Sequence, residues 1–460
     1  KKNLSIVILL ISLAISQSVF SQTYSFEKGK VPEGWKIDKG VLHISSEKYK
    51  SGSRSLQIKW KQNAVLTIPS PTGISEACRN RNGGMNAWIY NESPTKENLL
   101  FSFRDETGKE VCQLPFLLDF KGWRCIWAKF QGDMNMSSKS NIQSVEIQFP
   151  QHTKKGVTYI DLLEFTSKVS WQNMSDAQYK VNRTDYSLIP DFIGYRNATP
   201  KVEKVITAED NQITTITNRL TTWYLGSGQH SSERWIKMRT ENEKTFIRNG
   251  VKAAQKIKIQ YTEDHTPQGE PLFPMGAPTI IDGQEAKKFR SINENILLPL
   301  ALDYRKNQND QSLKKALYIY DWFNDQGWAD GSSMGTLCFE KLRSSGYFHS
   351  FFLLKEQLSP EQLKRELQTM NWFTMFGACY QLPSHAGEVA DNLRALAIPK
   401  LIYALSQNDK QEREVALTAF KHYMDNALGI APGFFGTFKA DFSGYHHRGS
   451  YHSAYYPHAL

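Results

Sequence analysis

The sequence has few cysteines, and they do not form a metal-binding pattern. Its five cysteines, Cys78, Cys112, Cys125, Cys338 and Cys379, are widely spaced and include no C-x-x-C pair. This spacing argues against a zinc site and against a dense disulfide framework. Cys112 and Cys125 could pair across neighbouring strands in an oxidising compartment, and buried free thiols are an equally good alternative.

The sequence also lacks an apolar run of the about 20 residues that a transmembrane helix needs. Its longest run, LSIVILLISLAI, follows Lys1 and Lys2 and precedes Val19-Phe20-Ser21, where a signal peptidase would cut before Gln22. We therefore expect residues 1–21 to be a signal peptide. The mature protein is expected to be exported, periplasmic or secreted, with no membrane partner.

No P-loop, dinucleotide-binding fingerprint or H-E-x-x-H pair is present. Acidic residues are outnumbered, with 46 Asp and Glu against 56 Lys and Arg and a net charge of +10. For an exported protein, such a surface suits anionic polysaccharides, anionic lipids or extracellular nucleic acid. Charge alone does not choose among these partners.

Residues 22–170 are predicted to form a β domain. Short alternating or β-branched runs recur about every ten residues between turn signals such as Asn82-Gly83-Gly84, as in a β-sandwich or jelly roll. The runs are VLHISS, SLQIKW, AVLTIP, MNAWIY, LLFSFRD, WRCIWAKF, VEIQFP and TYIDLLEF.

The remainder of the chain is predicted to be helical. The polar stretch 171–205 is predicted to be a linker, and in 206–460 the runs SINENILLPLALDYRK, SLKKALYIYDWFNDQG and NLRALAIPKLIYALSQ have apolar residues at helical spacing. Ser359-Pro360-Glu361-Gln362 is a typical helix start. Paired helices with short breaks and no strands between them are expected, arranged as layers of a toroid.

Three segments of the helical half are unusual in composition. In DWFNDQGWADGSS, residues 321–333, Trp322 and Trp328 could stack on sugar rings, although core packing is the favoured reading. In HAGEVADNLRALAI, residues 385–398, Asn392 could be a helix cap or surface residue, or its amide could donate to a carboxylate. His349 in GYFHSFF is interpreted as a packed histidine.

The third unusual segment is GYHHRGSYHSAYYPHAL at residues 444–460. Its histidines and tyrosines could simply form an aromatic cluster. Histidine and tyrosine together are also what a proton-abstraction site needs, since one group takes a proton and the other gives one. The segment is therefore the strongest candidate for catalysis.

At these residues the sequence resembles the chondroitin sulfate ABC lyases of polysaccharide lyase family 8. The resemblance runs through nearly the whole mature chain and rests on the order of several segments. These are GKVPEGWKIDKGVLHISSEKYKSGSRSLQIKWK, FKGWRCIWAKF, TYIDLLEF, DQGWADGSS, ADNLRAL and FKHYMDNALG…FSGYHHRGSYHSAYYP. It implies a jelly-roll, carbohydrate-binding-like domain, then an incomplete α/α toroid that ends within the helical domain, and β-elimination on chondroitin and dermatan sulfate.

The resemblance also implies roles for individual residues. Asn392 matches an asparagine that faces the substrate carboxylate, a tail histidine is the base, and Tyr455 is the acid that protonates the leaving oxygen. The base is His447 by alignment with the ABC branch and His446 by the spacing of the hyaluronate and chondroitin AC branches. Trp322, Trp328, Tyr451 and Arg448 are expected to bind substrate. The family's arginine and glutamate lie downstream of the His/Tyr pair, so this sequence is expected to contain only part of the site.

A structural divalent cation, calcium or magnesium, is implied for the β domain. The matching positions are Ser25, Glu27, Lys50, Ser53 and Asp161. Taken together, the sequence predicts a monomeric lyase that acts on an anionic glycosaminoglycan and not on nucleic acid. A glycosaminoglycan-binding protein without turnover, or an inactive fragment of the lyase, is the main alternative, and a hydrolase is the third.

Overall fold

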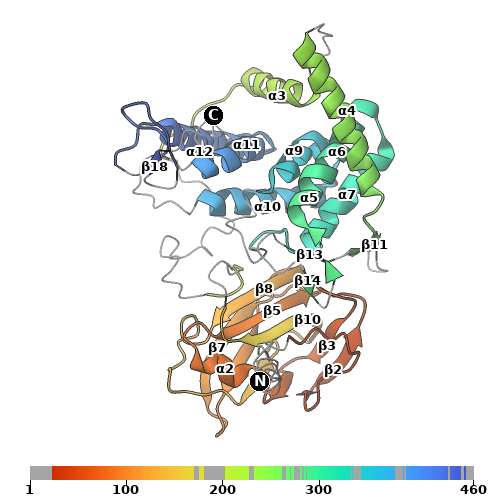
Figure 1. Cartoon of the computed structure of the whole chain (residues 1–460), viewed down its shortest axis with the longest axis vertical. Coiled ribbons are helices and arrows are strands. Elements are labelled where there is room, and N and C mark those ends of the chain that lie inside the picture. Colours follow the sequence, from red (N-terminus) through yellow and green to blue (C-terminus); the bar gives the residue numbers. More distant parts are fainter. Residues whose placement is uncertain are drawn as a thin grey trace, which may run out of the picture.

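The computed structural model describes residues 23–169, 176–180, 202–226, 233–261, 266–269, 271–273, 280–281, 284–285, 287–332, 334, 343–378, 387, 390–433, 436–446 and 450–451. Within these ranges a β-sandwich is followed by a helical domain (Figure 1), which confirms the predicted order of β then α. The predicted signal peptide and most of the predicted linker lie outside the described residues.

Two antiparallel sheets make up the sandwich. The first sheet has the order β1 (Lys36–Ile37), β4 (Val65–Pro69), β9 (Ser144–Gln148), β6 (Asn98–Arg104) and β7 (Glu110–Leu117). The second has the order β2 (Gly40–Ser45), β3 (Ser55–Lys61), β10 (Lys155–Thr166), β5 (Gly84–Asn91) and β8 (Gly122–Lys129). A short helix, α2 (Ile74–Arg79), contacts β5 and β10.

Both faces of the second sheet are covered. In β8, Ile126 and Ala128 point into the sandwich core, whereas Trp123, Cys125 and Trp127 belong to a separate cluster on the opposite face. Successive side chains of a strand point to opposite faces, so the run WRCIWA, which is apolar except for Arg124, reflects burial on both sides. The second sheet therefore presents an aromatic face outward, toward the helical domain.

Each of the eight apolar runs predicted as strands lies in a strand of the sandwich. Strand β7 was not predicted, and its sequence EVCQLPFL contains Pro115. Proline cannot donate a backbone hydrogen bond and occurs in sheets mainly on edge strands. β7 is the edge strand of the first sheet, so the proline that conceals the strand in the sequence is tolerated in the structure.

The helical domain is built from helices that contact others near them in the sequence. Its contacts include those of α4 with α6, α6 with α7, α6 with α9, α10 with α11 and α11 with α12. The helices are α3 (Asp210–Leu225), α4 (Arg234–Ala254), α5 (Phe289–Ile292), the π-helical turn η3 (Asn293–Leu297), α6 (Leu298–Asn307), α7 (Asp310–Asp325), α9 (Ser345–Leu354), α10 (Pro360–Ala378), α11 (Ala390–Leu405) and α12 (Lys410–Leu428). Among the described residues, no helix is long and apolar enough to cross a bilayer.

The predicted start of α10 is confirmed in detail. The Ser359 hydroxyl accepts a hydrogen bond from the backbone N–H of Gln362 at 3.2 Å, and the Gln362 side chain accepts one from the backbone N–H of Ser359 at 3.2 Å. This reciprocal arrangement satisfies two donors that would otherwise be unpaired at the helix end.

The prediction that no strands separate the helices is wrong. Six short strands lie between α4 and α5, and each has only two or three residues, too few to show a period in the sequence. They are β11 (Ile259–Tyr261), β12 (Pro267–Gly269), β13 (Leu272–Phe273), β14 (Ile280–Ile281), β15 (Gln284–Glu285) and β16 (Lys287–Lys288).

Three of the cysteines are described, and all three are buried free thiols. Cys112 lies on β7 of the first sheet and Cys125 on β8 of the second, so they are not on neighbouring strands. The suggested Cys112–Cys125 disulfide is therefore wrong, and the alternative of free thiols is confirmed for these residues. Burial raises the pKa of Cys112 to about 12, which keeps this thiol protonated.

Part of the predicted linker is packed rather than exposed. Asp176 and Tyr179 are buried, and they accept hydrogen bonds from the backbone N–H groups of Cys125 and Trp127 at 2.8 and 2.7 Å. Both acceptors bind strand β8 through its backbone. Residues 176–180 therefore cover the edge of the second sheet, a role that polar composition does not reveal.

Candidate functional site

A β-hairpin carries the start of the histidine-rich tail. Strand β17 (Tyr445–His446) pairs with β18 (Ser450–Tyr451), and His446 lies opposite Ser450 in the register. β17 also contacts α11, the helix that carries Asn392. The fold therefore brings together two segments that sequence reasoning had linked only through a family resemblance.

Asn392 lies in the first turn of α11 and is 2% exposed. Of the alternatives left open by the sequence, the surface position is therefore wrong. A buried asparagine side chain must have hydrogen-bond partners, and its amide is able to donate to a carboxylate. The amino end of a helix also favours negative charge, so the first turn of α11 suits an anionic group.

Side-chain hydrogen bonds to the backbone hold the segment before the hairpin and the segment before α11. Lys439 is buried beside the ring of Tyr445, at 4.8 Å from its centroid, and donates to the carbonyl of Gly433 at 2.9 Å. The Asn426 side chain accepts from the backbone N–H of Gly387 at 3.0 Å and donates to its carbonyl at 3.2 Å. These contacts were not predicted, because a lone lysine or asparagine gives no periodic signal.

Several predicted site residues cannot be located. His447, Arg448 and Tyr455 lie outside the described residues, and for His446 and Tyr451 the backbone alone is described. Their proposed roles remain predictions.

Trp322 and Trp328 are not available to bind substrate. Both are 0% exposed and belong to the core of the helical domain. The Trp328 ring stacks on Phe373, with ring centroids 3.6 Å apart and planes 13° apart. A sugar ring needs an open aromatic face, so the substrate-stacking role is wrong and the favoured reading of core packing is confirmed.

The segment around these tryptophans instead joins the two domains. Asp325, at the end of α7, accepts a hydrogen bond from the Tyr90 hydroxyl of β5 at 2.7 Å, and Lys48 lies 4.0 Å from the same oxygen. The backbone carbonyl of Asp330 accepts from Arg124 of β8 at 2.9 Å. The unusual composition of DWFNDQGWADGSS therefore reflects domain docking.

Lys50 is the centre of this interface. Its ammonium group is fully buried and donates to the carbonyl of Leu272 at 2.6 Å and to both the carbonyl and the side-chain oxygen of Gln326, at 2.9 and 3.0 Å. Burial lowers the pKa of Lys50 to about 7, and the charge of Asp325 opposes that shift. These three hydrogen bonds tie the β-sandwich to the segment around β13 and to the end of α7.

An aromatic cluster that was not predicted lies on α3 and α9. The Tyr224 hydroxyl is hydrogen-bonded to Nδ1 of His349, and the Trp223 ring lies 5.9 Å from the histidine ring. Trp223 remains 53% exposed. Two adjacent aromatic residues before Gly226 at a helix end are the sequence feature that could have indicated it. The interpretation of His349 as a packed histidine is confirmed.

The burial of His349 predicts that the folded protein becomes less stable in acid. Burial lowers its pKa from 6.5 to about 4, so between these values the unfolded chain binds a proton that the folded chain does not. Folding stability should therefore fall as the pH drops from about 6.5 to 4, by about 2 kcal/mol from this residue. Urea unfolding of the wild type and His349→Gln at pH 7 and pH 4.5 measures it. An identical loss of stability in both proteins would contradict the assignment.

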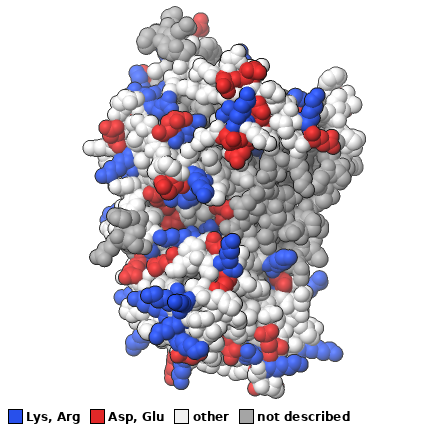
Figure 2. Space-filling model, turned by 180° about the vertical axis from the view of Figure 1, so that it is seen from behind, with Lys and Arg blue, Asp and Glu red and all other residues white. Residues whose placement is uncertain are grey.

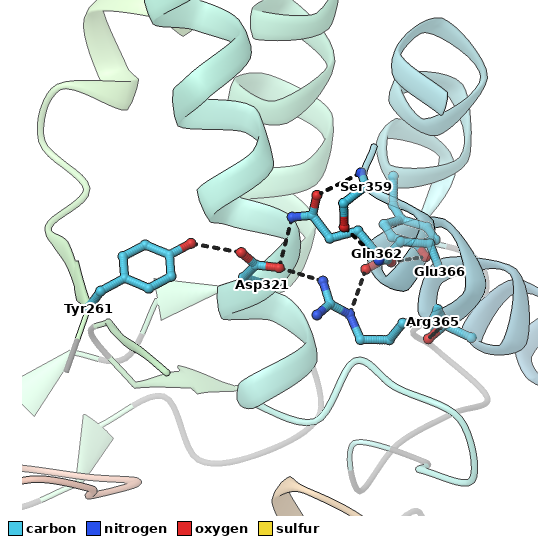
Figure 3. A network of polar contacts seen from close by, with 8 residues as sticks. Tyr261, Asp321, Ser359, Gln362, Arg365 and Glu366 are labelled. Carbon is cyan, nitrogen blue, oxygen red and sulfur yellow. Dashed lines mark hydrogen bonds and ion pairs between the residues drawn. The ribbon is translucent and has the colours of Figure 1, made fainter. Parts of the chain in front are cut away.

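A network of hydrogen bonds and ion pairs connects α7, α10 and β11 (Figure 3). Asp321 accepts hydrogen bonds from Tyr261 at 2.7 Å, from Gln362 at 3.0 Å and from Arg365 at 2.5 Å. Arg365 also donates to Glu366 at 3.3 Å. Because Arg365 binds both carboxylates, this pair lacks the free carboxylic acid and open gap that glycoside hydrolysis requires. The network is structural.

Some of the residues predicted to hold a cation lie close together in the β-sandwich. The Glu27 carboxylate accepts hydrogen bonds from the backbone N–H and hydroxyl of Ser53, at 3.0 and 2.9 Å. Asp161 is 0% exposed and accepts from the backbone N–H of Lys50 at 2.7 Å. Ser25 lies two residues from Glu27. Burial raises the pKa of Asp161 well above its usual range, and the charge of Glu27 raises it further.

The donor set fits a hard cation. Among the described residues there is no group of three or more His, Cys, Asp and Glu that could hold a metal ion, so a site here would need backbone oxygens as well. Phe26 and Leu162, beside the two carboxylates, have positive φ values of 62° and 51°. Non-glycine residues adopt this conformation at a cost, and such residues often lie at binding sites.

Two family models match the chain. One, described as "Lyase, N terminal", matches residues 20–181, and the other, "Lyase, catalytic", matches residues 199–458. The second covers more than half of the chain.

Two curated relatives extend this result. Chondroitin sulfate ABC exolyase of Bacteroides thetaiotaomicron is 25% identical over 464 residues, which cover 93% of this chain and 43% of the relative. The enzyme of the same description from Proteus vulgaris is 20% identical over 467 residues, covering 95% of this chain and 46% of the relative. The chain thus spans less than half the length of these relatives.

Solved structures give only weak similarity. A family 11 carbohydrate-binding module of a Clostridium thermocellum cellulase has a TM-score of 0.23 at 13% identity, covering 32% of this chain and 94% of its own. An exo-beta-agarase has a TM-score of 0.29 at 11% identity, covering 55% of this chain and 36% of its own. At such scores neither supports an argument about fold or function.

Proposed function

Because the chain belongs to the polysaccharide lyase family, we propose that it cleaves chondroitin sulfate and dermatan sulfate by β-elimination, leaving a 4,5-unsaturated uronate at the new non-reducing end. The observation that carries the proposal is the match of the catalytic lyase family over residues 199–458. The two curated relatives that act on chondroitin sulfate support the choice of substrate.

The chemistry requires three groups. The proton at C5 of a uronate lies next to a carboxylate, whose negative charge opposes formation of a carbanion, so that carboxylate must be neutralised. A base must then remove the C5 proton, and an acid must protonate the leaving oxygen at C4. In the proposal Asn392 donates to the carboxylate, His447 or His446 is the base, and Tyr455 is the acid.

The described structure supports this assignment at two points. Asn392 lies in the first turn of α11, where the helix end favours a carboxylate, and β17, which contains His446, contacts the same helix. Both segments are held by side-chain hydrogen bonds to the backbone, made by the buried Lys439 and by Asn426 of α12. A rigid scaffold of this kind reduces the cost of aligning substrate and catalytic groups.

The proposal is tested by the ultraviolet absorbance of the unsaturated product. With the full-length protein, we expect chondroitin sulfate to yield this product and dextran sulfate, a polyanion without uronate, to yield none. Binding of chondroitin sulfate that weakens with salt, with no absorbance change at any pH, would instead show a glycosaminoglycan-binding protein without turnover.

We also propose that the protein is exported, which the apolar run within residues 1–21 supports, and that it acts as a monomer.

A calcium or magnesium ion is proposed to bind at Glu27 and Asp161, with backbone oxygens of Ser25, Lys50 and Ser53 completing the site. A bound cation would offset the charge of two neighbouring carboxylates, one of them buried. We expect a chelator to lower the melting temperature of the wild type by a few degrees, which corresponds to about 1 kcal/mol. Glu27→Gln should be insensitive to the chelator. Equal sensitivity of both proteins, or none in either, would contradict the site.

A further inference from the structure

A groove with a basic wall lies on the helical domain. It runs between α4 and the junction of α6 with α7 and has a volume of about 530 Å³. Figure 1 shows α4 on the opposite side of the helical domain from β18, so the groove is remote from the candidate site. Its lining includes Lys244, Ile247, Arg248, Val251, Lys252 and Lys306, which we call the basic groove.

Two cations in the basic groove are available to a ligand. Arg248 and Lys252 are exposed, and neither forms an ion pair or side-chain hydrogen bond with the described residues. With Lys244 they recur every fourth residue along α4, which places them on one face about 6 Å apart along the helix axis. Like charges at this spacing destabilise a helix slightly, and a bound anion would relieve that cost.

The acidic residues of the groove are already compensated. Glu243 forms an ion pair with Lys306. Asp303 accepts hydrogen bonds from the side chains of Asn307 at 2.7 Å, Asn309 at 2.7 Å and Ser312 at 2.5 Å. The oxygens of these carboxylates are therefore already bound by neighbouring side chains. The charge that the groove presents to a ligand is positive.

The shape and chemistry of the groove fit one class of ligand. Val251 is half-buried and provides apolar surface between Arg248 and Lys252, where the C–H face of a sugar ring could lie. Figure 2 shows Lys and Arg over both domains of the rear face with Asp and Glu between them, so the net charge of +10 does not form one uniform field on that face. A local groove is then a better anion site than the general surface.

We propose that the basic groove is a second binding site for an anionic polysaccharide, which holds a segment of the sulfated chain away from the point of cleavage. The inference rests on the proposed function, because that function supplies the ligand class. The ligand bridges Arg248 and Lys252 through its sulfate and carboxylate groups, whereas Lys244, at the end of the row, is already paired with Glu241 at 2.9 Å. Such a site raises the affinity for long chains through simultaneous binding at two places.

The test compares two double variants of the same helix. Arg248→Ala/Lys252→Ala removes two charges from the groove, and Arg234→Ala/Lys237→Ala removes two from the other half of α4, outside the groove lining. Binding of long-chain chondroitin sulfate is measured by calorimetry at low temperature, where cleavage is slow. The melting temperature of each variant checks that it is folded. We expect the groove variant to bind about fivefold to tenfold more weakly, with a shallower salt dependence, and the control to bind within about twofold of the wild type.

The outcomes separate this inference from the function on which it rests. Equal weakening in both variants, or in neither, overturns the groove while leaving the proposed function intact. Failure of the wild type to bind or cleave chondroitin sulfate overturns both. Loss of affinity for a DNA duplex in the groove variant, with chondroitin sulfate binding unchanged, would show that the groove serves nucleic acid instead.

Discussion

Replacing Tyr455 by phenylalanine should reduce turnover of chondroitin sulfate at least about 100-fold, because the variant cannot protonate the leaving oxygen. A phenylalanine ring keeps the size of the side chain, so substrate binding should change little. The loss should therefore appear in kcat, with KM nearly unchanged. The measurement is the initial rate of unsaturated-uronate absorbance.

The neighbouring tyrosine is the matched control. Tyr456→Phe makes the same chemical change one residue along the chain and should keep most of the activity. Single alanine variants at His446 and His447 then identify the base, since only one of them should reproduce the large loss in kcat. Full activity in Tyr455→Phe and in both histidine variants would refute the assignment of the tail.

Removing the Asp325 carboxylate should destabilise the folded chain by about 3 to 5 kcal/mol. Asp325→Ala leaves Lys48 without its nearby carboxylate and Tyr90 without its acceptor, both in the buried domain interface. Burial raises the pKa of Asp325, and the charge of Lys48 opposes that shift. Denaturant unfolding of the two proteins at pH 7 measures the difference.

Tyr90→Phe is a milder change at the same interface, for comparison with the stability loss in Asp325→Ala. It removes the 2.7 Å hydrogen bond to Asp325 and leaves the charges in place, so a loss of about 1 to 2 kcal/mol is expected. If Asp325→Ala were no more damaging than Tyr90→Phe, the interface would be held by its aromatic residues alone. An additional unfolding transition in Asp325→Ala would show that the domains had separated.

The elements of both domains could be predicted from the sequence because their periods are strong. The run in β8 and the helix around Ser312 carry apolar residues at the spacing that each structure requires. Strand β7 was missed because Pro115 is normally a signal against a strand, and only its position at the sheet edge makes it acceptable. Strands as short as β13 leave no pattern to find.

The functional residues were predicted less well, for a different reason. Trp322 and Trp328 have the composition of a sugar-binding loop, and burial, which sequence does not report, places them in the core. The contact of Lys50 with Gln326 joins residues far apart in the chain, so no local pattern could reveal it. Asn392 and His446 were linked through family resemblance, and the structure adds that their segments are in contact.

The mass of the cleavage product tests the central claim most directly. Elimination splits the polysaccharide without adding water, whereas hydrolysis adds one water to each cut. After incubation with chondroitin sulfate, we predict an oligosaccharide at the mass of the unsaturated product. A product heavier by one water would contradict the account and show that the enzyme is a hydrolase.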